Sequence, residues 1–343
     1  MRKCGLIPCV ILSLVAQASF AQGGGLSSSP CPAGGIVAGV PDQTRIAQDV
    51  CTQAYDVYQF MSPQLGLALA GGNATIGQGG TLGGIGHLSV GIRGNVFKGL
   101  YPDLTQFPRS TNGAVQRELP TKSQYLGLPT ADAALGIFKG IPLGLTNVGG
   151  IDLLGSASFV PSYSGDNVSL TPERNWQFGY GARVGILQES IISPGVSVTY
   201  LKRDLPKTSI IGTSNSDSLR VVDATVKTTA WRVVASKSLI KFGIAGGVGR
   251  DKYDQSAAIE GVVHTTVAGL PVTGRAAVPA SATQQSLTRT NYFLDLSLNL
   301  ATLKLVGEVG SVSGGTVNTF NSFSGGRADR SLVYGSLGIR LGW

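Results

Sequence analysis

The sequence predicts an all-β protein, a transmembrane antiparallel β-barrel of about 12 strands (10 to 14) with a short N-terminal helical segment. Only 13% of the 343 residues are charged, yet beyond the N-terminus no stretch approaches the roughly 20 apolar residues of a spanning helix. From residue 64 onward apolar and polar residues alternate, and long polar connections alternate with short ones. A closed barrel also satisfies its backbone inside lipid, so these observations together favour it.

Residues 1–21 are predicted to be a cleaved secretory signal peptide. Two basic residues precede an apolar stretch from Gly5 to about Ala16, and Ser19 and Ala21 occupy the small-residue positions of a cleavage site. A membrane anchor is the alternative, but the apolar stretch is too short to span a bilayer comfortably.

Cys31 and Cys51 are the two cysteines that remain after this cleavage. In an oxidising compartment such a pair predicts a disulfide, and two buried thiols are the alternative. Closing a loop of this size contributes about 3 kcal/mol. The two histidines, His87 and His264, have no nearby Cys or His, so we expect no metal site.

Residues 22–62 are predicted to form a periplasmic or plug segment with a helix. The segment is rich in Gly, Ser and Pro as far as Pro41, and Asp42 is then suited to cap a helix. Apolar residues follow at spacings of three and four, which is typical of one helix face. They are Ile46, Val50, Cys51, Ala54, Val57 and Met61. Two placements remain open: a helix against the barrel mouth or periplasmic rim, and a plug inside the lumen.

Residues 63–343 are predicted to form the barrel. The clearest alternation, with period two, runs through 88–96, 176–186, 292–300 and 303–309. Less regular strands are expected at 131–139, 149–161, 195–204, 221–236 and 239–250, and short ones at 64–71 and 74–80. A slip of phase near residues 230–232 predicts a bulge. Residues 251–288 are expected to add a hairpin or extended strand tips.

The connections alternate in length along the chain. Long ones at 313–330, 251–288, 205–219, 164–174 and 104–130 take turns with short ones near 301 and 238, at 188–194 and at 140–148. Bacterial outer-membrane barrels place short turns in the periplasm and long loops outside. We therefore expect the outer membrane of a Gram-negative-type bacterium, with a secreted all-β protein as the alternative.

The last strand ends on an aromatic residue. Val333, Leu337 and Leu341 fall on its apolar face, which is expected to meet outer-membrane lipid. Trp343 then lies where an aromatic girdle belongs, at the periplasmic end. A terminal aromatic after alternating apolar residues also resembles the assembly signal read by the barrel assembly machinery, which is therefore an expected partner.

The residues opposite the apolar set are predicted to face the lumen. A charged side chain facing lipid at mid-bilayer costs roughly 2 to 4 kcal/mol, so charges of both signs belong inside. The candidate ligand- or lumen-lining residues are His87, Arg93, Asp132, Asp152, Gln177, Arg183, Asp223, Lys227, Lys241, Asp295, Lys304, Glu308, Tyr334 and Arg340. They either form paired networks that fill the barrel or line a wet pathway.

Catalysis, cofactors and nucleic acid are not predicted. A hydrolase needs a nucleophile with a base in hydrogen-bond reach, and His87 with Ser89 is the only candidate pair. The glycine-rich stretch GGTLGGIG lacks the strand-to-helix context of a nucleotide site. A net charge of +8 spread among acidic residues does not indicate nucleic-acid binding.

Three stretches carry a resemblance to a known group. They are IPLGLTNVGGIDLLGSASFVPSY, FGYGARVGILQESIISPGVSVTYLKRDLP and TTAWRVVASKSLIKFGIAGGVGRDKY, and the most specific element within them is GILQESIISPGVSVTY. Their layout resembles uncharacterised outer-membrane barrels that are distantly similar to FadL-type transporters of hydrophobic compounds. The resemblance implies an N-terminal hatch inside the barrel, which residues 22–62 would supply. No binding residue is carried over.

Two functions from different classes follow. The first is passive transport of small, hydrophobic molecules across the outer membrane, gated by the N-terminal segment. The alternative is a non-conducting structural or surface-interaction barrel that binds partners through its extracellular loops. An apolar pocket near the long loops favours transport, whereas a lumen filled by paired charges favours the alternative. A general porin is a third possibility that needs a wider barrel.

Overall fold

The computed structural model describes residues 25–32, 41–165, 168–214, 217–267 and 270–343. The predicted signal peptide, residues 1–21, lies outside the described residues. Within the described ranges, no helix is long and apolar enough to cross a membrane.

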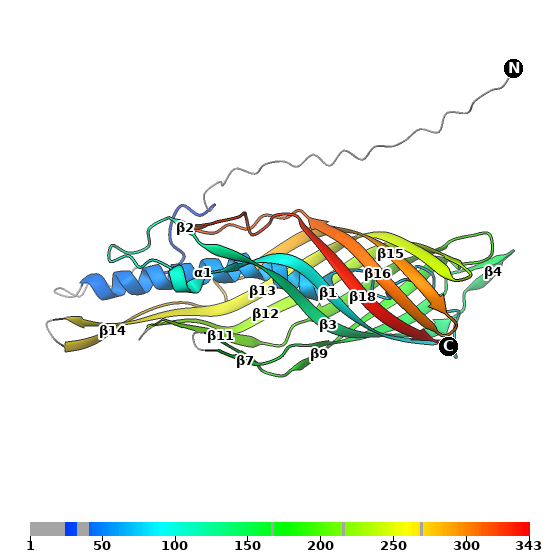
Figure 1. Cartoon of the computed structure of the whole chain (residues 1–343), viewed down its shortest axis with the longest axis horizontal. Coiled ribbons are helices and arrows are strands. Elements are labelled where there is room, and N and C mark those ends of the chain that lie inside the picture. The colour runs from blue at the N-terminus through cyan, green and yellow to red at the C-terminus, as the bar shows by residue number, and fades with distance from the viewer. Residues whose placement is uncertain (1–24, 33–40, 166–167, 215–216, 268–269) are drawn as a thin grey trace, which may run out of the picture.

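Ten antiparallel strands close into a barrel (Figure 1). Each strand pairs with the next, including β12 with β13, and β18 pairs with β1 to close the ring. In ring order the strands are β1 (Leu88–Pro102), β3 (Thr121–Phe138), β6 (Ile151–Phe159), β9 (Trp176–Leu187), β10 (Gly195–Asp204), β12 (Asp217–Leu239), β13 (Phe242–Val267), β15 (Gln285–Leu300), β16 (Leu303–Ser313) and β18 (Leu332–Gly342). The all-β barrel is thus confirmed, with ten strands in the ring.

Ten strands in the ring lie within the predicted range of 10 to 14, but the count of 12 is not confirmed because residues 64–71 and 74–80 are not strands. Residues 64–70 form the last turns of the helix α1 (Pro41–Ala70), and residues 74–80 have no regular structure. Leu65, Leu67 and Leu69 alternate with small residues and therefore look like a strand in the sequence. This part of α1 is enclosed by the barrel wall on all sides, so it has no polar face to reveal a helical period.

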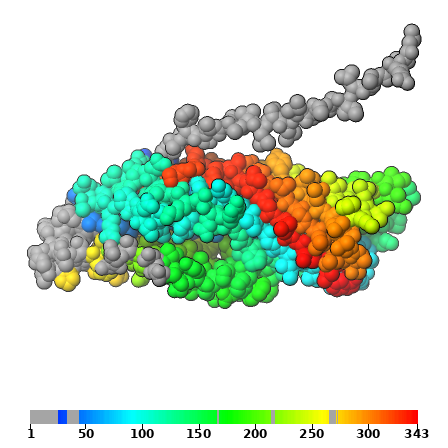
Figure 2. Space-filling model, in the orientation of Figure 1, coloured from blue at the N-terminus to red at the C-terminus, as the bar shows by residue number. Residues whose placement is uncertain are grey.

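The two ends of the barrel differ. The short-turn end carries the turns at 240–241 and 301–302, the connection 188–194 and a small hairpin of β4 (Ile141–Leu143) and β5 (Thr146–Val148). The long-connection end carries residues 103–120 with the 3₁₀ turn η1 (Leu104–Gln106), and residues 314–331. There β2 (Glu118–Leu119) pairs with β17 (Ser322–Phe323), and Figure 2 shows these two connections side by side.

A belt of apolar side chains surrounds the outside of the barrel. The outward residues Ile92, Leu296 and Leu337 are 67%, 61% and 76% exposed. Toward the long-connection end the outward positions become charged: Lys98 on β1 and Arg250 on β13 are both exposed. Because a charged residue is costly against lipid, these residues mark the border of the belt.

Several strands continue beyond this border. There β12 and β13 pair with β11 (Thr208–Ser214) and β14 (Leu270–Val278), and the sheet continues through β8 (Val168–Pro172) to β7 (Tyr163–Ser164). The first half of α1 packs against this sheet. We call the two together the outer layer, and its buried core includes Cys31, Ala47, Cys51, Ala54, Tyr58, Val221, Ile259, Val263 and Val278. The outer layer is therefore an ordered unit that projects past the apolar belt.

The predicted disulfide between Cys31 and Cys51 is present. Both cysteines are buried, and their Cα atoms lie 6.1 Å apart. The bond ties residues 25–32 to α1, so the start of the described chain is part of the outer layer.

Asp56 on α1 fixes the connection 314–331 to the outer layer. Its Oδ1 accepts a hydrogen bond from the amide of Phe320 at 2.8 Å, and its Oδ2 accepts two from Asn321 at 2.8 Å. Burial raises the pKa of the Asp56 carboxyl to about 7, although these three donors oppose the shift. The folded protein therefore holds the proton on Asp56 more tightly than the unfolded chain does.

We predict that the outer layer loses stability as pH rises between 3.8, the ordinary pKa of this carboxyl, and about 7. A raised folded-state pKa contributes stability that is complete below the unfolded pKa and is lost as pH rises through the folded value. Proteolysis of the outer layer, measured across this range, should become faster with pH, and Asp56→Asn should flatten the dependence. An equal pH dependence in the variant would contradict this origin.

Candidate functional site

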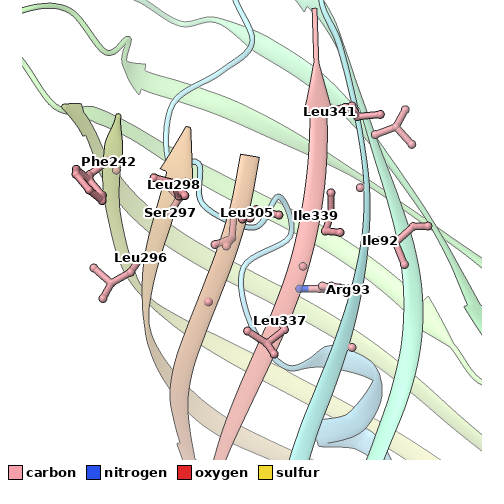
Figure 3. A pocket seen from close by; sticks show the side chains of 17 residues that line it. Ile92, Arg93, Phe242, Leu296, Ser297, Leu298, Leu305, Leu337, Ile339 and Leu341 are labelled. Atoms are coloured by element: carbon pink, nitrogen blue, oxygen red, sulfur yellow. The ribbon is translucent and has the colours of Figure 1, made fainter. Parts of the chain in front are cut away.

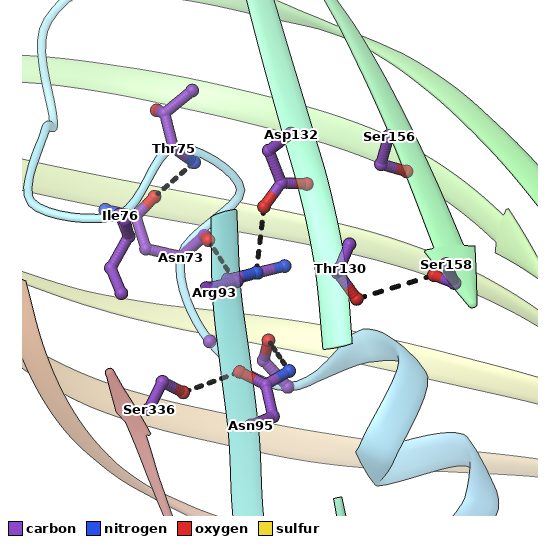
Figure 4. A network of polar contacts seen from close by, with 12 residues as sticks. Asn73, Thr75, Ile76, Arg93, Asn95, Thr130, Asp132, Ser156, Ser158 and Ser336 are labelled. Atoms are coloured by element: carbon purple, nitrogen blue, oxygen red, sulfur yellow. Dashed lines mark hydrogen bonds and ion pairs between the residues drawn. The ribbon is translucent and has the colours of Figure 1, made fainter. Parts of the chain in front are cut away.

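The lumen within the apolar belt is occupied by the chain itself. The last turn of α1 continues into residues 71–87, and residues 71–87 alone are here called the lumen segment. Together the two run from the long-connection end to the start of β1. Leu69, Ala70, Asn73 and Thr75 are at most 5% exposed. Figure 4 shows the lumen segment enclosed by the wall, close to β1 and β3. The candidate site is therefore the contact between wall and segment.

Arginines of the wall meet the C-terminal end of α1. Arg203 on β10 donates to the carbonyl of Leu69 at 3.3 Å, and Arg232 on β12 donates to the carbonyl of Ala70. Arg93 on β1 donates to a carbonyl of the lumen segment at 2.5 Å. The last carbonyls of a helix lack helical partners and carry partial negative charge, so guanidinium groups suit this end.

Buried carboxylates balance these arginines. Asp132 on β3 lies 2.9 Å from Arg93 and 2.8 Å from Arg203. Next to this group, Asp152 on β6 pairs with Arg183 on β9 at 2.6 Å, and neither side chain is more than 1% exposed. Arg232 has its own partner, Asp251 on β13, at 3.0 Å. A buried ion pair is costly unless its geometry is good, and here each pair also bonds to the segment or its neighbours.

Wall carboxylates also bind amide groups of the lumen segment. Glu308 on β16 accepts a bond from the amide of Asn73 at 2.7 Å, and Asp295 on β15 accepts one from the amide of Gly77 at 2.8 Å. The Tyr334 hydroxyl accepts a bond from the amide preceding Asn73 at 2.9 Å. These three acceptors stand on β15, β16 and β18. The segment is therefore fixed from several strands at once.

The predicted lumen residues divide by their burial. Seven of them are buried or nearly buried inside the barrel: Arg93, Asp132, Asp152, Arg183, Asp295, Glu308 and Tyr334. Gln177, Lys304 and Arg340 are partly buried, and Arg340 donates to the carbonyl of Ile76 at 3.3 Å. His87 is exposed at the short-turn end, where its Nδ1 lies 3.2 Å from the carbonyl of Gly84.

Three predicted lumen residues, Asp223, Lys227 and Lys241, are instead exposed. Lys241 lies in the turn between β12 and β13. The register of these strands is continuous from Thr225 to Leu239 and shifts only before Thr225, so the slip predicted near residues 230–232 is misplaced. Without that slip, Lys227 shares the outward face of Trp231.

Sequence reasoning missed Arg203, Arg232 and Asp251, which are at most 2% exposed. The misplaced slip hid the direction of Arg232. Arg203 stands between two other charged residues, Lys202 and Asp204, which obscured the alternation. The earlier outward residues of β10 do predict the direction of Arg203. It stands an odd number of positions after them, so its side chain points into the barrel.

Two of the cavities among the described residues bear on transport, and both lie outside the lumen. One, of about 290 Å³, opens at the long-connection end between α1 and the connections, and its apolar lining includes Val50, Leu104, Phe107 and Leu219. The other, of about 990 Å³, is a depression on the outer face of the belt, where Figure 3 shows side chains such as Phe242 and Leu296 projecting from the wall. The second therefore faces lipid. Among the described residues no group of His, Cys, Asp and Glu is arranged to hold a metal ion.

No protein-family model and no curated protein sequence matches this chain. Among solved structures, the transport unit of the autotransporter AIDA-I from Escherichia coli is similar, with 9% identity and a TM-score of 0.29 over 85% of this chain and 98% of that chain.

Two further outer-membrane proteins are also similar. OmpT of Vibrio cholerae has 10% identity and a TM-score of 0.21 over 80% of this chain and 99% of that chain. The anion-selective porin from Comamonas acidovorans has 10% identity and a TM-score of 0.19 over 75% of this chain and 98% of that chain. At these TM-scores the likeness carries no argument about function, and the resemblance to FadL-type transporters gains no support from it.

We predict that Arg183→Met destabilises the barrel by about 3 to 5 kcal/mol, because it leaves the fully buried Asp152 without its partner. The change is measured as a lower urea midpoint of protein folded in vesicles. The double variant with Asp152→Leu should recover most of the loss.

The matched control is Lys252→Met, which breaks the exposed pair of Lys252 and Asp254. Surface pairs contribute about 0 to 1 kcal/mol, so this variant should remain close to the parent. If Arg183→Met cost no more than Lys252→Met, the buried pair would not hold the lumen together.

Proposed function

We propose that this chain is an integral protein of a Gram-negative-type outer membrane whose barrel is closed by its own lumen segment and anchors the outer layer at the cell surface. In this role the outer layer and the long connections bind a partner, with no catalytic step, no cofactor and no nucleic acid. Outer-membrane lipid and the barrel assembly machinery are the other proposed partners. The observation that carries the proposal is the filled lumen with its buried charge pairs.

The cost of opening the lumen supports a closed barrel. For a solute to pass, the end of α1 and the lumen segment have to leave the wall. That movement separates Arg203 and Arg232 from the helix carbonyls, and Glu308 and Asp295 from backbone amides. A buried charged group that loses its hydrogen-bond partner costs about 1 to 3 kcal/mol or more. Because these contacts break together, spontaneous opening is rare.

The form of the outer layer supports a role in binding. It has its own buried core, and the disulfide and the Asp56 contacts hold its parts together. The strands β14 and β7 are the two ends of the sheet order, so the layer presents strand edges beyond the lipid. Binding residues are commonly found on connections positioned by a rigid scaffold, as residues 103–120 and 314–331 are here.

Passive transport of small, hydrophobic molecules is the second candidate function. The cavity at the long-connection end supports it, because Val50, Leu104 and Phe107 offer an apolar lining where a solute would enter. Transport through the barrel then requires the lumen segment to move.

We predict that the refolded mature protein shows no steady conductance in a planar bilayer. A variant lacking residues 22–62 should also stay closed, because residues 63–82 still fill the lumen, whereas a variant lacking residues 22–82 should conduct. Folding of each variant is checked by circular dichroism and by heat-dependent migration in a gel.

The two candidate functions predict different conductance for the parent and for the variant lacking residues 22–62. Steady conductance by the parent, or by the variant lacking residues 22–62, would contradict the closed barrel and support gated transport. Silence in both, with conductance after the longer deletion, identifies residues 63–82 as the seal.

A further inference from the structure

The first described residues lie at the long-connection end of the barrel. The amide of Leu26 donates to the carbonyl of Thr319 at 3.1 Å, and the Gln116 side chain donates to the carbonyl of Leu26 at 2.8 Å. The disulfide from Cys31 then joins this stretch to α1. Residues 25–32 are thus packed among the long connections.

The first barrel strand begins at the opposite end. The amide of Leu88 donates to the carbonyl of Trp343 at 2.9 Å, and the amide of Trp343 donates back at 3.1 Å. Between the disulfide and Leu88 the chain therefore passes from one end of the barrel to the other. Its route is the lumen, through the last turns of α1 and the lumen segment (Figure 1).

The apolar belt separates these two ends, so the N-terminal segment and the short turns lie on opposite sides of the membrane. Short turns face the periplasm in outer-membrane barrels, and the N-terminal segment is then outside. We infer that this barrel carries its own N-terminal segment outward through its lumen and displays it at the cell surface. This self-translocation goes beyond the proposed anchoring and does not depend on any binding partner.

The chemistry of the wall suits a passing chain. Most of its hydrogen bonds go to the backbone of the end of α1 and of the lumen segment, although Asn73 and Thr75 are also bonded through their side chains. Arg93, Arg203, Arg232 and Arg340 donate to carbonyls, and Asp152, Asp295, Glu308 and Tyr334 accept from amides. Every residue offers a carbonyl, and every residue except proline offers an amide. A wall of this kind satisfies successive stretches of the chain during passage.

The dimensions allow a single helix or extended chain. A helix with its side chains is about 10 to 12 Å wide. Barrel diameter grows with the number of strands, so a ten-stranded ring has a wider interior than an eight-stranded one, which is just filled by its own side chains. This interior already encloses the last turn of α1, where Leu69 and Ala70 are at most 1% exposed. The many inward glycines, such as Gly243 and Gly247, keep side-chain volume out of the lumen. After passage the outer-layer core prevents return.

Three single-cysteine variants test the inference in intact cells. Ser28→Cys lies in the N-terminal segment, Asn112→Cys in a long connection and Thr302→Cys in a short turn, and all three positions are exposed. The reagent is a maleimide on a polyethylene glycol chain too large to pass through porins. Cys31 and Cys51 are bonded to each other, and Cys4 and Cys9 lie in the predicted signal peptide, so the introduced thiol is the one expected to react in the mature protein.

We expect Ser28→Cys and Asn112→Cys to be labelled on intact cells and Thr302→Cys to be labelled only after the outer membrane is permeabilised. Labelling of Asn112→Cys without Ser28→Cys would place the N-terminal segment inside and overturn the inference. Labelling of Thr302→Cys alone would mean that the barrel has the opposite orientation in the membrane, and this result would overturn the inference as well. Heat-dependent migration in a gel verifies that each labelled variant is folded.

A fusion measures the translocation itself. A small soluble reporter without cysteines is placed ahead of residue 25, behind the native signal, and protease is added to intact cells. We expect the reporter to be removed while the barrel remains. If the reporter resists the protease in cells that nevertheless display residue 28, only the native N-terminal segment passes through the barrel. That result would overturn translocation as a general activity of the barrel.

Discussion

The structure depends on hydrogen bonds between wall side chains and the backbone of the lumen segment. This segment has no regular structure, and residues 71–77 of it are buried inside the barrel. A buried backbone group without a partner costs free energy comparable to a lost hydrogen bond. Arginines and carboxylates on opposite strands supply those partners, which explains why so many charged residues lie inside this barrel.

The same bonds connect the two halves of the molecule. Arg203 and Arg232 hold the end of α1, whose other end forms the core of the outer layer. Asp132 and Asp251 pair with these arginines and orient them between the strands. One network of hydrogen bonds therefore fixes the position of the helix, closes the lumen and holds the outer layer in place. A substitution in the wall is expected to affect the outer layer as well.

The sequence predicts the wall well and the interior poorly. Alternation along 176–186 and 292–300 reproduces β9 and β15 because lipid on one side and a polar lumen on the other impose a period of two. That rule fails for Leu65, Leu67 and Leu69, because Leu67 and Leu69 are fully buried and Leu65 is half-buried, with no polar face between them. Local pattern also cannot show which arginine meets which carbonyl, since those partners come together only when the ring closes.

Hydrogen–deuterium exchange of the lumen segment tests the central claim most directly. The amides of Gly72, Asn73 and Gly77 donate to side chains of the wall, although they belong to no helix or strand. In the folded protein we predict that they exchange as slowly as the strand amides of the belt, because exposing them requires the wall contacts to break together. Exchange at the rate of an unstructured loop would mean that the lumen is open and would contradict the account.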